Sequence, residues 1–365
     1  MSRGRAALGL VLLLAGCGAP GAGDEAPTAT AAASSAAESV TLLATGDVLV
    51  HQDGALVAGA ATGDGGYDFT DVFAPVAPLI AAADLALCHL ETPVAPEAGP
   101  FRGYPGFAVQ PQVVDALADA GYDLCTTASN HSLDDGVDGL DRTLDVLDAA
   151  GIASAGTYRS AAESTTPVVV DAAGVRVASV AATSGLNGVP LPAGRPWAVD
   201  VADVPDVDGV LAAAARARAA GAEIVVASLH CCREYEHEPT AAQEEAVRTL
   251  LASPDVDLVL GHHAHVVQPF ERIDGEWAAY GLGNHLAEHA TRGFPTEDSV
   301  AARFTFTRGA DGRFAVSRAE AVPLRIDRRP DRVQVAPADP ATAARVAEVL
   351  DRRGAVAAGL AIVPG

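Results

Sequence analysis

The stretch from Val256 to Gln268 reads VDLVLGHHAHVVQ and guides the interpretation of the whole chain. Its first five residues, Val256 to Leu260, form a mostly apolar run that is typical of a short buried strand. Gly261 interrupts the run, and three candidate metal ligands follow: His262, His263 and His265. Side chains on an extended segment repeat every two residues, so we expect the rings of His263 and His265 on the same side. The alternative is a polar loop that is rich in histidine by chance.

Five other apolar runs also end in Asp, Glu, Asn or His. They are Thr41–Asp47, Leu85–Glu91, Leu124–His131, Glu223–His230 and Trp277–His285. In an open α/β sheet, ligands bind at the carboxyl ends of the strands. These strand ends therefore predict one shared site. Oxygen and imidazole ligands together favour Mn, Fe, Zn or Mg over a metal that prefers thiolates.

The rest of the pattern predicts a mixed α/β fold. Apolar spacing and terminal glycines mark helices over Tyr67–Ala83, Pro111–Ala120, Val137–Ala150, Val204–Ala220, Ala241–Leu251 and Pro340–Arg353. Alternation and turn residues mark hairpins in Pro167–Val180, around Asp274–Gly275 and in Val300–Arg325. Strands that alternate with helices early and pair as hairpins late indicate an α/β sandwich, and we expect one domain over residues 39–365.

The composition limits the partners. The chain has 365 residues and a formal net charge of −23, and every basic residue is arginine. An acidic surface argues against nucleic acid as a partner. Such a surface also has a simpler explanation, which is that it keeps the protein soluble.

The first residues predict export and a lipid anchor. Met1–Arg5 is basic, and Ala6–Ala15 is apolar but too short to span a bilayer. The run ends in Leu-Ala-Gly-Cys17, which resembles a bacterial lipobox, so we expect residues 1–17 to be a lipoprotein signal peptide with Cys17 diacylated. Residues 18–38 are rich in small and polar residues and read as a flexible tether. The predicted location is the extracytoplasmic face of the bacterial cell membrane; the alternative is an ordinary secretory signal or an uncleaved anchor.

Four further cysteines lack the regular spacing of a disulfide framework. Cys88 and Cys125 lie inside apolar runs, and we expect them to be small, buried, inert side chains. The pair Cys231-Cys232 follows a candidate ligand directly. It allows a vicinal disulfide, a thiolate ligand or two thiols without a role, and we favour the last.

The strand-end motifs together resemble one known family. They are Gly46-Asp47, Leu90-Glu91, Ser129-Asn130-His131, His230 with Glu234-Tyr235, Gly261–His265 and Gly283-Asn284. This set is similar to the CapA family, which is named for poly-γ-glutamate capsule synthesis and has a calcineurin-like metallophosphoesterase fold. The resemblance covers roughly residues 40–325. It implies a four-layer α-β-β-α sandwich with two divalent metal ions held between the sheets.

The resemblance also implies a role for each residue. Asp47 and His265 would bind the first ion, Asn130, His230 and His263 the second, and Glu91 would stand where the wider group has a bridging Asp. His131 would be the catalytic residue that protonates the departing oxygen. Residues expected beside the metals or the substrate are His51, Glu234, Tyr235, His262 and Asn284. We expect His89 to be a histidine of the core or between layers, and His237, His285 and His289 to be peripheral.

This chain departs from the wider group at three places. Asp47 is followed by Val48 and Leu49, so the usual Asp-x-His histidine is missing, and His51 is a displaced substitute. Glu91 is longer than the Asp it replaces. Cys231-Cys232 stands where the family often has Trp-Gly. The motifs therefore support metal binding better than turnover.

Two functions are compatible with the sequence. The first is an exported metal-dependent hydrolase that cleaves a phosphoester or a related bond, or acts in capsule synthesis. The second is a non-catalytic surface lipoprotein that binds or organises a capsule polymer and keeps a relict metal site. Expected partners are the membrane, through the lipid anchor, and a capsule polymer or the envelope synthesis machinery.

Overall fold

The computed structural model describes residues 38–289 and 295–365. The predicted signal peptide, Cys17 and residues 18–37 of the predicted tether lie outside the described residues. Within the described part, no helix has the length and apolar character needed to cross a membrane.

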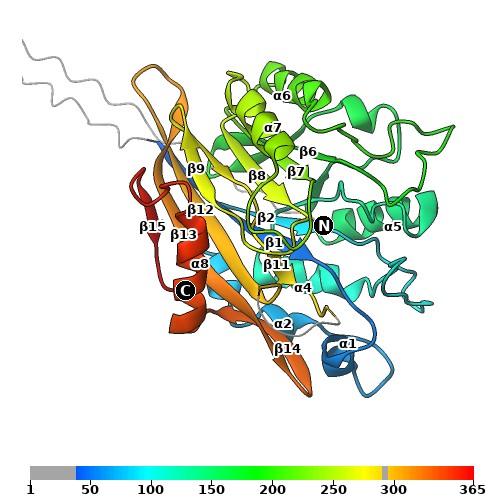
Figure 1. Cartoon of the computed structure of the whole chain (residues 1–365). Coiled ribbons are helices and arrows are strands. Elements are labelled where there is room, and N and C mark those ends of the chain that lie inside the picture. Colours follow the sequence, from blue (N-terminus) through cyan, green and yellow to red (C-terminus); the bar gives the residue numbers. More distant parts are fainter. Residues whose placement is uncertain (1–37, 290–294) are drawn as a thin grey trace, which may run out of the picture. The chain divides into compact units, whose positions relative to one another are not determined.

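Two β-sheets stack on each other (Figure 1). Among the described residues, the larger sheet has the strand order β14 (Arg332–Pro337), β13 (Phe314–Arg329), β12 (Asp298–Arg308), β1 (Ser39–Val48), β2 (Leu85–Leu90), β3 (Leu124–Thr126) and β4 (Ala153–Ala155). Two short strands join it: β11 (Asn284–Leu286) pairs with β1, and β15 (Leu360–Ile362) pairs with β13. The smaller sheet has the order β5 (Val168–Ala172), β6 (Val175–Thr183), β7 (Ile224–His230), β8 (Leu258–His262), β10 (Glu276–Ala279) and β9 (Phe270–Ile273).

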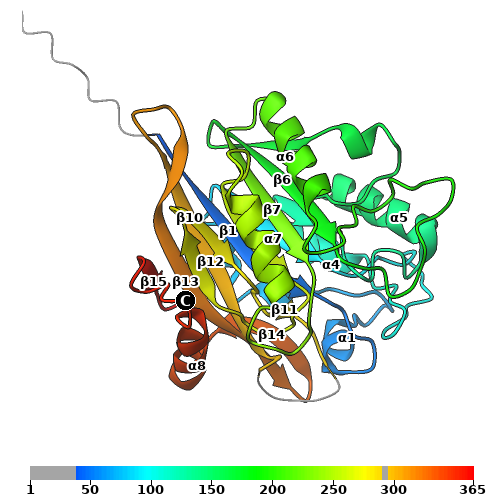
Figure 2. The ribbon, with the colours of Figure 1, turned by 45° about the horizontal axis from the view of Figure 1, so that its top comes forward.

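Apolar cores separate four layers. Leu42 and Leu87 of the larger sheet pack against Val226 and Leu258 of the smaller sheet in the central core. A second core joins the outer face of the larger sheet to α1 (Ala55–Ala60), α2 (Thr70–Phe73), α3 (Ala77–Ile80) and α4 (Gln112–Ala120). A third core joins the outer face of the smaller sheet to α6 (Asp208–Ala219) and α7 (Ala241–Leu251), as Figure 2 shows. The prediction of an α-β-β-α sandwich is confirmed.

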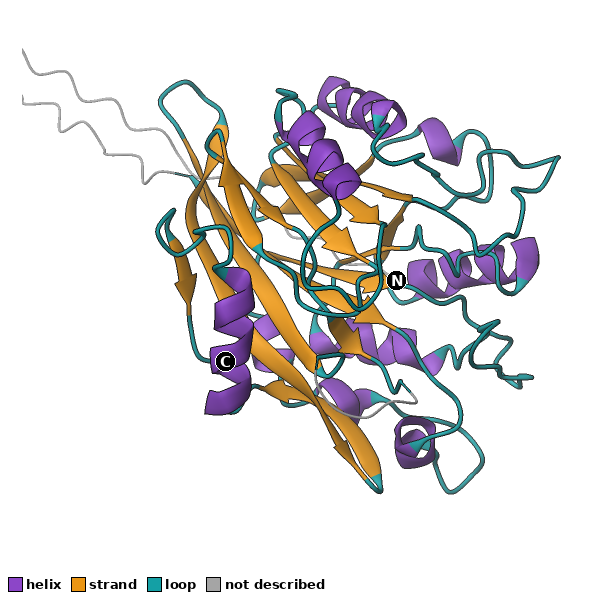
Figure 3. Ribbon diagram, in the orientation of Figure 1, coloured by secondary structure: helices purple, strands orange, loops and turns teal. Residues whose placement is uncertain are grey.

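The remaining helices lie at the sides of the sandwich (Figure 3). The helix α5 (Gly136–Ala149) contacts β4, and α8 (Pro340–Leu350) contacts β12 and β13. A short 3₁₀ helix, η1, covers Glu163–Thr165. All of these elements belong to one compact unit.

Two sequence expectations about elements were wrong. The helix expected over Tyr67–Ala83 is split into α2 and α3, because Pro75 and Pro78 lack the N–H groups that a continuous helix needs. The run Trp277–His285 is not one strand: β10 belongs to the smaller sheet and β11 to the larger one. Gly283 has a φ of +71° at this crossing.

Candidate metal centre

The parallel strands of both sheets end at one edge and bring the polar residues together. In the larger sheet, Asp47 of β1 lies opposite His89 of β2, and Glu91 follows β2 directly. In the smaller sheet, His230 at the end of β7 lies opposite His262 at the end of β8. A Cβ atom at Gly46 would collide with the carbonyl oxygen of Gly283, so only glycine permits this close approach of the two segments.

The carboxylate of Glu91 is the centre of the cluster. It is buried, and neither oxygen has a hydrogen-bond partner among the described residues. Its Oε1 lies 3.7 Å from Nε2 of His230, 3.8 Å from Nε2 of His265 and 4.0 Å from Nε2 of His131. These distances are too long for hydrogen bonds but suit groups that share an ion at about 2 Å.

Burial raises the pKa of Glu91 well above its ordinary value, although the nearby His265 opposes this. An isolated buried carboxylate is costly, and a bound cation compensates that cost. Two overlapping groups of ligand atoms lie within 4.8 Å of one another: Asp47, His89, Glu91 and His230, and Glu91, His263 and His265. This buried set of Asp, Glu and His residues could hold metal, and its oxygen and nitrogen donors fit a divalent ion.

Asp47 is held as a carboxylate. Its Oδ1 accepts a hydrogen bond from Nδ1 of His262 at 2.9 Å, and its Oδ2 accepts one from the backbone N–H of His263 at 3.0 Å. Burial favours a raised pKa, but the hydrogen bonds from His262 and His265 outweigh it and hold the pKa of Asp47 well below the ordinary value. His262 therefore positions Asp47, and it also stacks on His89 with ring centroids 4.2 Å apart.

His263 and His265 reach the cluster by a route that differs from the expected one. Strand β8 ends at His262, and His263 and His265 have φ values of +83° and +55°. The expectation of an extended His-x-His segment was therefore wrong, since both residues adopt left-handed loop conformations. Their rings still lie close, with centroids 5.9 Å apart.

Asn284 fixes the orientation of His265. Its Nδ2 donates to the carbonyl oxygens of His265 and Thr296, which leaves Oδ1 to accept from Nδ1 of His265 at 2.9 Å. Nε2 of His265 then faces Glu91. Burial lowers the pKa of His265, but the negative charges of Glu91 and Asp47 raise it to about 9 overall. The two carboxylates beside His265 therefore favour a positively charged group at this place.

Asn130 and His131 reach the cluster from the loop after β3. Oδ1 of Asn130 lies 3.0 Å from Nε2 of His230. Nδ1 of His131 lies 2.6 Å from Oδ2 of Asp134, which also accepts from the backbone N–H of Phe107. Asp134 was not among the predicted residues, although its position three residues after His131 in a turn was a usable signal.

Other predicted residues lie beside the cluster or at its opening. Glu234, whose side chain is 39% exposed, has Oε1 4.0 Å from Nε2 of His263. Tyr235, which is 51% exposed, lies with its ring centroid 5.9 Å from that of His265. His51 belongs to neither ligand group of the described residues; its Nδ1 accepts from the backbone N–H of Glu288 at 3.2 Å. His51 therefore does not replace the missing Asp-x-His histidine.

The histidines expected outside the site lie in different environments. His237 donates from Nδ1 to the carbonyl oxygen of Val267, and His285 is buried against Tyr122. The ring centroid of His289 lies only 5.1 Å from that of His265. His89 is buried between the layers as expected, but its direct link to His230 was not predicted. The signal was available, because His89 in β2 and Glu91 directly after it are two residues apart, a spacing that places side chains of an extended segment on one side.

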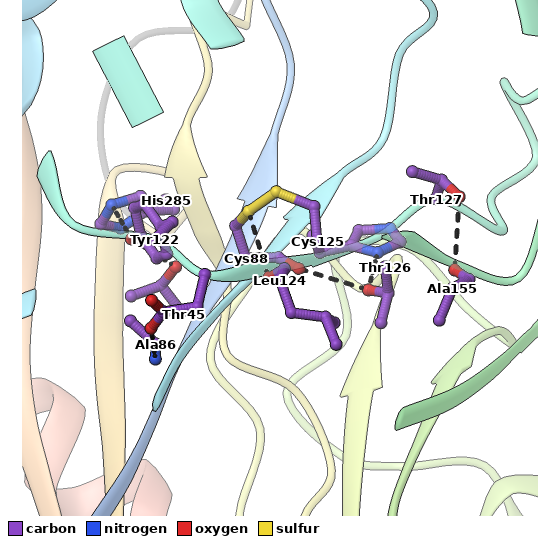
Figure 4. The surroundings of a disulfide bond; sticks show 12 residues. Thr45, Ala86, Cys88, Tyr122, Leu124, Cys125, Thr126, Thr127, Ala155 and His285 are labelled. Atoms are coloured by element: carbon purple, nitrogen blue, oxygen red, sulfur yellow. Dashed lines mark hydrogen bonds between the residues drawn. A yellow bond between two sulfur atoms is a disulfide. The ribbon is translucent and has the colours of Figure 1, made fainter. Parts of the chain in front are cut away.

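The expectation of unpaired cysteines was wrong. The parallel pairing of β2 and β3 places Cys88 opposite Cys125, and the two form a disulfide with Cα atoms 4.4 Å apart (Figure 4). Cys231 and Cys232 form a vicinal disulfide directly after His230, with Cα atoms 3.7 Å apart. Neither pair supplies a thiolate ligand.

Residues 41–289 match the family model described as bacterial capsule synthesis protein PGA_cap. The chain belongs to the PGA_cap family. This family member is 25% identical over 250 residues to the PGA biosynthesis protein CapA of Bacillus subtilis, covering 67% of this chain and 64% of that protein. It is 31% identical over 219 residues to a probable polyglutamine synthesis accessory protein of Mycobacterium tuberculosis, covering 57% of each. The chain thus spans about three fifths of the length of these relatives.

Among solved structures, the PGA_cap protein is similar to the calcineurin-like phosphoesterase YfkN of Bacillus subtilis. The identity is 17% and the TM-score 0.47, over 79% of this chain and 91% of that chain. A second similar structure is the NAD nucleotidase of Haemophilus influenzae, with 10% identity and a TM-score of 0.46, over 90% of this chain and 64% of the other.

Proposed function

We propose that this PGA_cap protein is a metal-dependent hydrolase that acts on a phosphoester or a related bond in capsule or envelope synthesis. The observation that carries the proposal is the buried Glu91 carboxylate without a hydrogen-bond partner among the described residues, with three imidazole nitrogens at 3.7–4.0 Å. Keeping this carboxyl ionised in a buried site is costly, and a cation bound beside it would offset that cost.

The proposed cofactor is a pair of divalent ions, Mn, Fe, Zn or Mg. The proposed ligands are Asp47, Glu91, Asn130, His230, His263 and His265. When bound, the ions would polarise a phosphoryl oxygen and lower the pKa of water, so that hydroxide is available to attack at neutral pH.

The proposed role of His131 follows from its two neighbours. Asp134 accepts a hydrogen bond from Nδ1 of His131 and so orients the ring. Nε2 then lies on the side of Glu91, at 4.0 Å from Oε1. A proton held at Nε2 would be positioned for transfer to the oxygen that leaves when the ester bond breaks, with the ring held in place by Asp134.

A second function is favoured by the state of Asp47. Both of its oxygens already accept hydrogen bonds, from His262 and from the backbone of His263, and the usual Asp-x-His partner is missing. This arrangement supports a relict first metal site in a lipoprotein that binds or organises a capsule polymer without turnover.

The deciding experiment is elemental analysis of the purified protein and its Glu91→Gln variant, followed by a phosphoester substrate screen with each divalent metal. We expect wild-type protein to retain metal through dialysis, Glu91→Gln to lose it, and turnover to require the metal. Metal retention without turnover on any substrate would favour the polymer-organising function. Absence of metal from both proteins would contradict the metal centre itself.

A further inference from the structure

A line of hydrogen-bonding groups runs from the backbone of β2 to the proposed metal ligands. The carbonyl oxygen of Cys88 lies 3.4 Å from Oγ1 of Thr126, which lies 2.8 Å from Nδ1 of His89. Nε2 of His89 lies 2.9 Å from Nδ1 of His230, and Nε2 of His230 lies 3.0 Å from Oδ1 of Asn130. All five residues are buried.

Both ends of this line are acceptors. The carbonyl oxygen of Cys88 has no proton to give. Nδ2 of Asn130 donates to Oδ1 of Asn187 at 3.2 Å, which turns Oδ1 of Asn130 toward His230. The side of His230 that faces Asn130 also lies 3.7 Å from Oε1 of Glu91.

The line has four contacts between polar groups but too few protons to make each contact a hydrogen bond. Histidine binds a metal as the neutral imidazole, which carries one proton on its two ring nitrogens. Thr126 contributes one proton and each neutral ring one, which gives three protons for the four links. One link must therefore contain two facing lone pairs.

The position of that link decides whether His230 can bind metal. If it lies between Cys88 and Thr126, Nε2 of His230 carries a proton and donates to Asn130. If it lies between His230 and Asn130, then Nε2, Oδ1 and the carboxylate of Glu91 all present lone pairs to one place. A cation at that place would bind the lone pairs of His230 and Asn130 that face each other. Every polar group in the line would then have a partner.

We propose that His89 is a positioning residue that holds His230 in its metal-binding tautomer. His89 accepts from Nδ1–H of His230 and donates from Nδ1–H to Thr126, and Thr126 donates to the carbonyl of Cys88. This inference rests on the proposed metal centre. It assigns His89, whose two ring nitrogens face Thr126 and His230, to positioning and not to metal ligation.

The test measures the affinity of the purified protein for Zn²⁺ and for Mn²⁺, each by competition with a chelator. His89→Phe keeps the ring volume but loses both hydrogen bonds, and we expect a roughly 10- to 100-fold weaker affinity. His89→Gln restores an acceptor toward His230 and a donor toward Thr126, so most of the affinity should return. If the role of His89 were purely structural, His89→Gln would bind metal as weakly as His89→Phe.

A second pair of variants avoids any change of the histidine. Thr126→Val removes the hydroxyl at similar volume and should weaken metal binding, whereas Thr126→Ser should not. Thermal unfolding of the metal-free variants serves as the control for folding. Wild-type metal affinity in His89→Phe or in Thr126→Val would overturn the positioning role of His89 alone. A wild-type protein that binds neither Zn²⁺ nor Mn²⁺ would overturn both that role and the metal centre.

Discussion

At the scale of single residues, the chemistry depends on how each imidazole is oriented. His262 donates to Asp47, Asn284 turns His265 toward Glu91, and Asp134 holds His131. The residue types and spacing predicted the histidines themselves. Asp47 and Asn284 become partners of His262 and His265 only through the packing of the two sheets, which the sequence alone does not determine. Asp134 is a local partner, three residues after His131.

The clearest division of roles at this scale is between His131 and His263. We expect His131→Ala to keep its metal but to lose turnover by roughly 10²–10⁴-fold, because it removes a proton donor. His263→Ala should instead lose metal, because it removes a ligand from the group of Glu91, His263 and His265. Metal content and turnover are measured on both variants. Equal metal loss in the two would make His131 a ligand and end its role as the acid.

Asp134 should act only through His131. Asp134→Asn removes the negative charge beside Nδ1 of His131, so we expect turnover to fall by roughly 10- to 100-fold while metal content is unchanged. In the double variant with His131→Ala, the Asp134 substitution should cause no further loss. An additional loss in the double variant would show that Asp134 acts on something else.

At the scale of elements, periodicity predicted what a run of residues becomes but not where it is interrupted. The apolar stripe of Tyr67–Ala83 is buried as expected, yet the two prolines divide it into α2 and α3. The crossing from β10 to β11 places Asn284 beside Asp47 in the larger sheet. One apolar run can contribute strands to two sheets when glycines let the backbone turn between them. No local pattern distinguishes such a run from a single strand.

Strand β10 contains a carboxyl group that should make stability depend on pH. Burial, reinforced by the charge of Asp257, raises the pKa of Glu276 from 4.5 to about 7. Between these values the folded chain binds more protons than the unfolded chain, so stability falls as the pH rises. Glu276→Gln should therefore raise the thermal unfolding midpoint relative to wild type at about pH 8 and change it little at about pH 5.

The matched control for this prediction is Glu245→Gln on α7, where the residue is exposed. We expect Glu245→Gln to follow the wild-type midpoint at both pH values. A pH-independent difference between Glu276→Gln and wild type would mean that packing, and not ionisation, determines the effect.

At the scale of the whole molecule, alternation of strands and helices predicted the sandwich, because each sheet must cover both faces with apolar layers. The convergence of strand ends followed from the same reasoning, since parallel strands of facing sheets end at a common edge. The sequence did not predict the Cys88–Cys125 disulfide. The register of β2 and β3 that places Cys88 opposite Cys125 is a tertiary property. The predicted lipoprotein signal lies within residues 1–37, which are outside the described part.

The predicted lipid anchor can be tested directly. Leu-Ala-Gly-Cys17 follows a basic and an apolar segment, and we propose that Cys17 carries the lipid that anchors the protein. Each buried CH₂ of an acyl chain contributes about 0.8 kcal/mol, so two chains anchor a protein stably and their loss should release it. Cys17→Ser should therefore move the protein from the membrane fraction to the soluble fraction, whereas Ser34→Ala should not. Both are measured by fractionation and immunoblotting, and a Cys17→Ser protein that stays with membranes as strongly as wild type would refute the anchor.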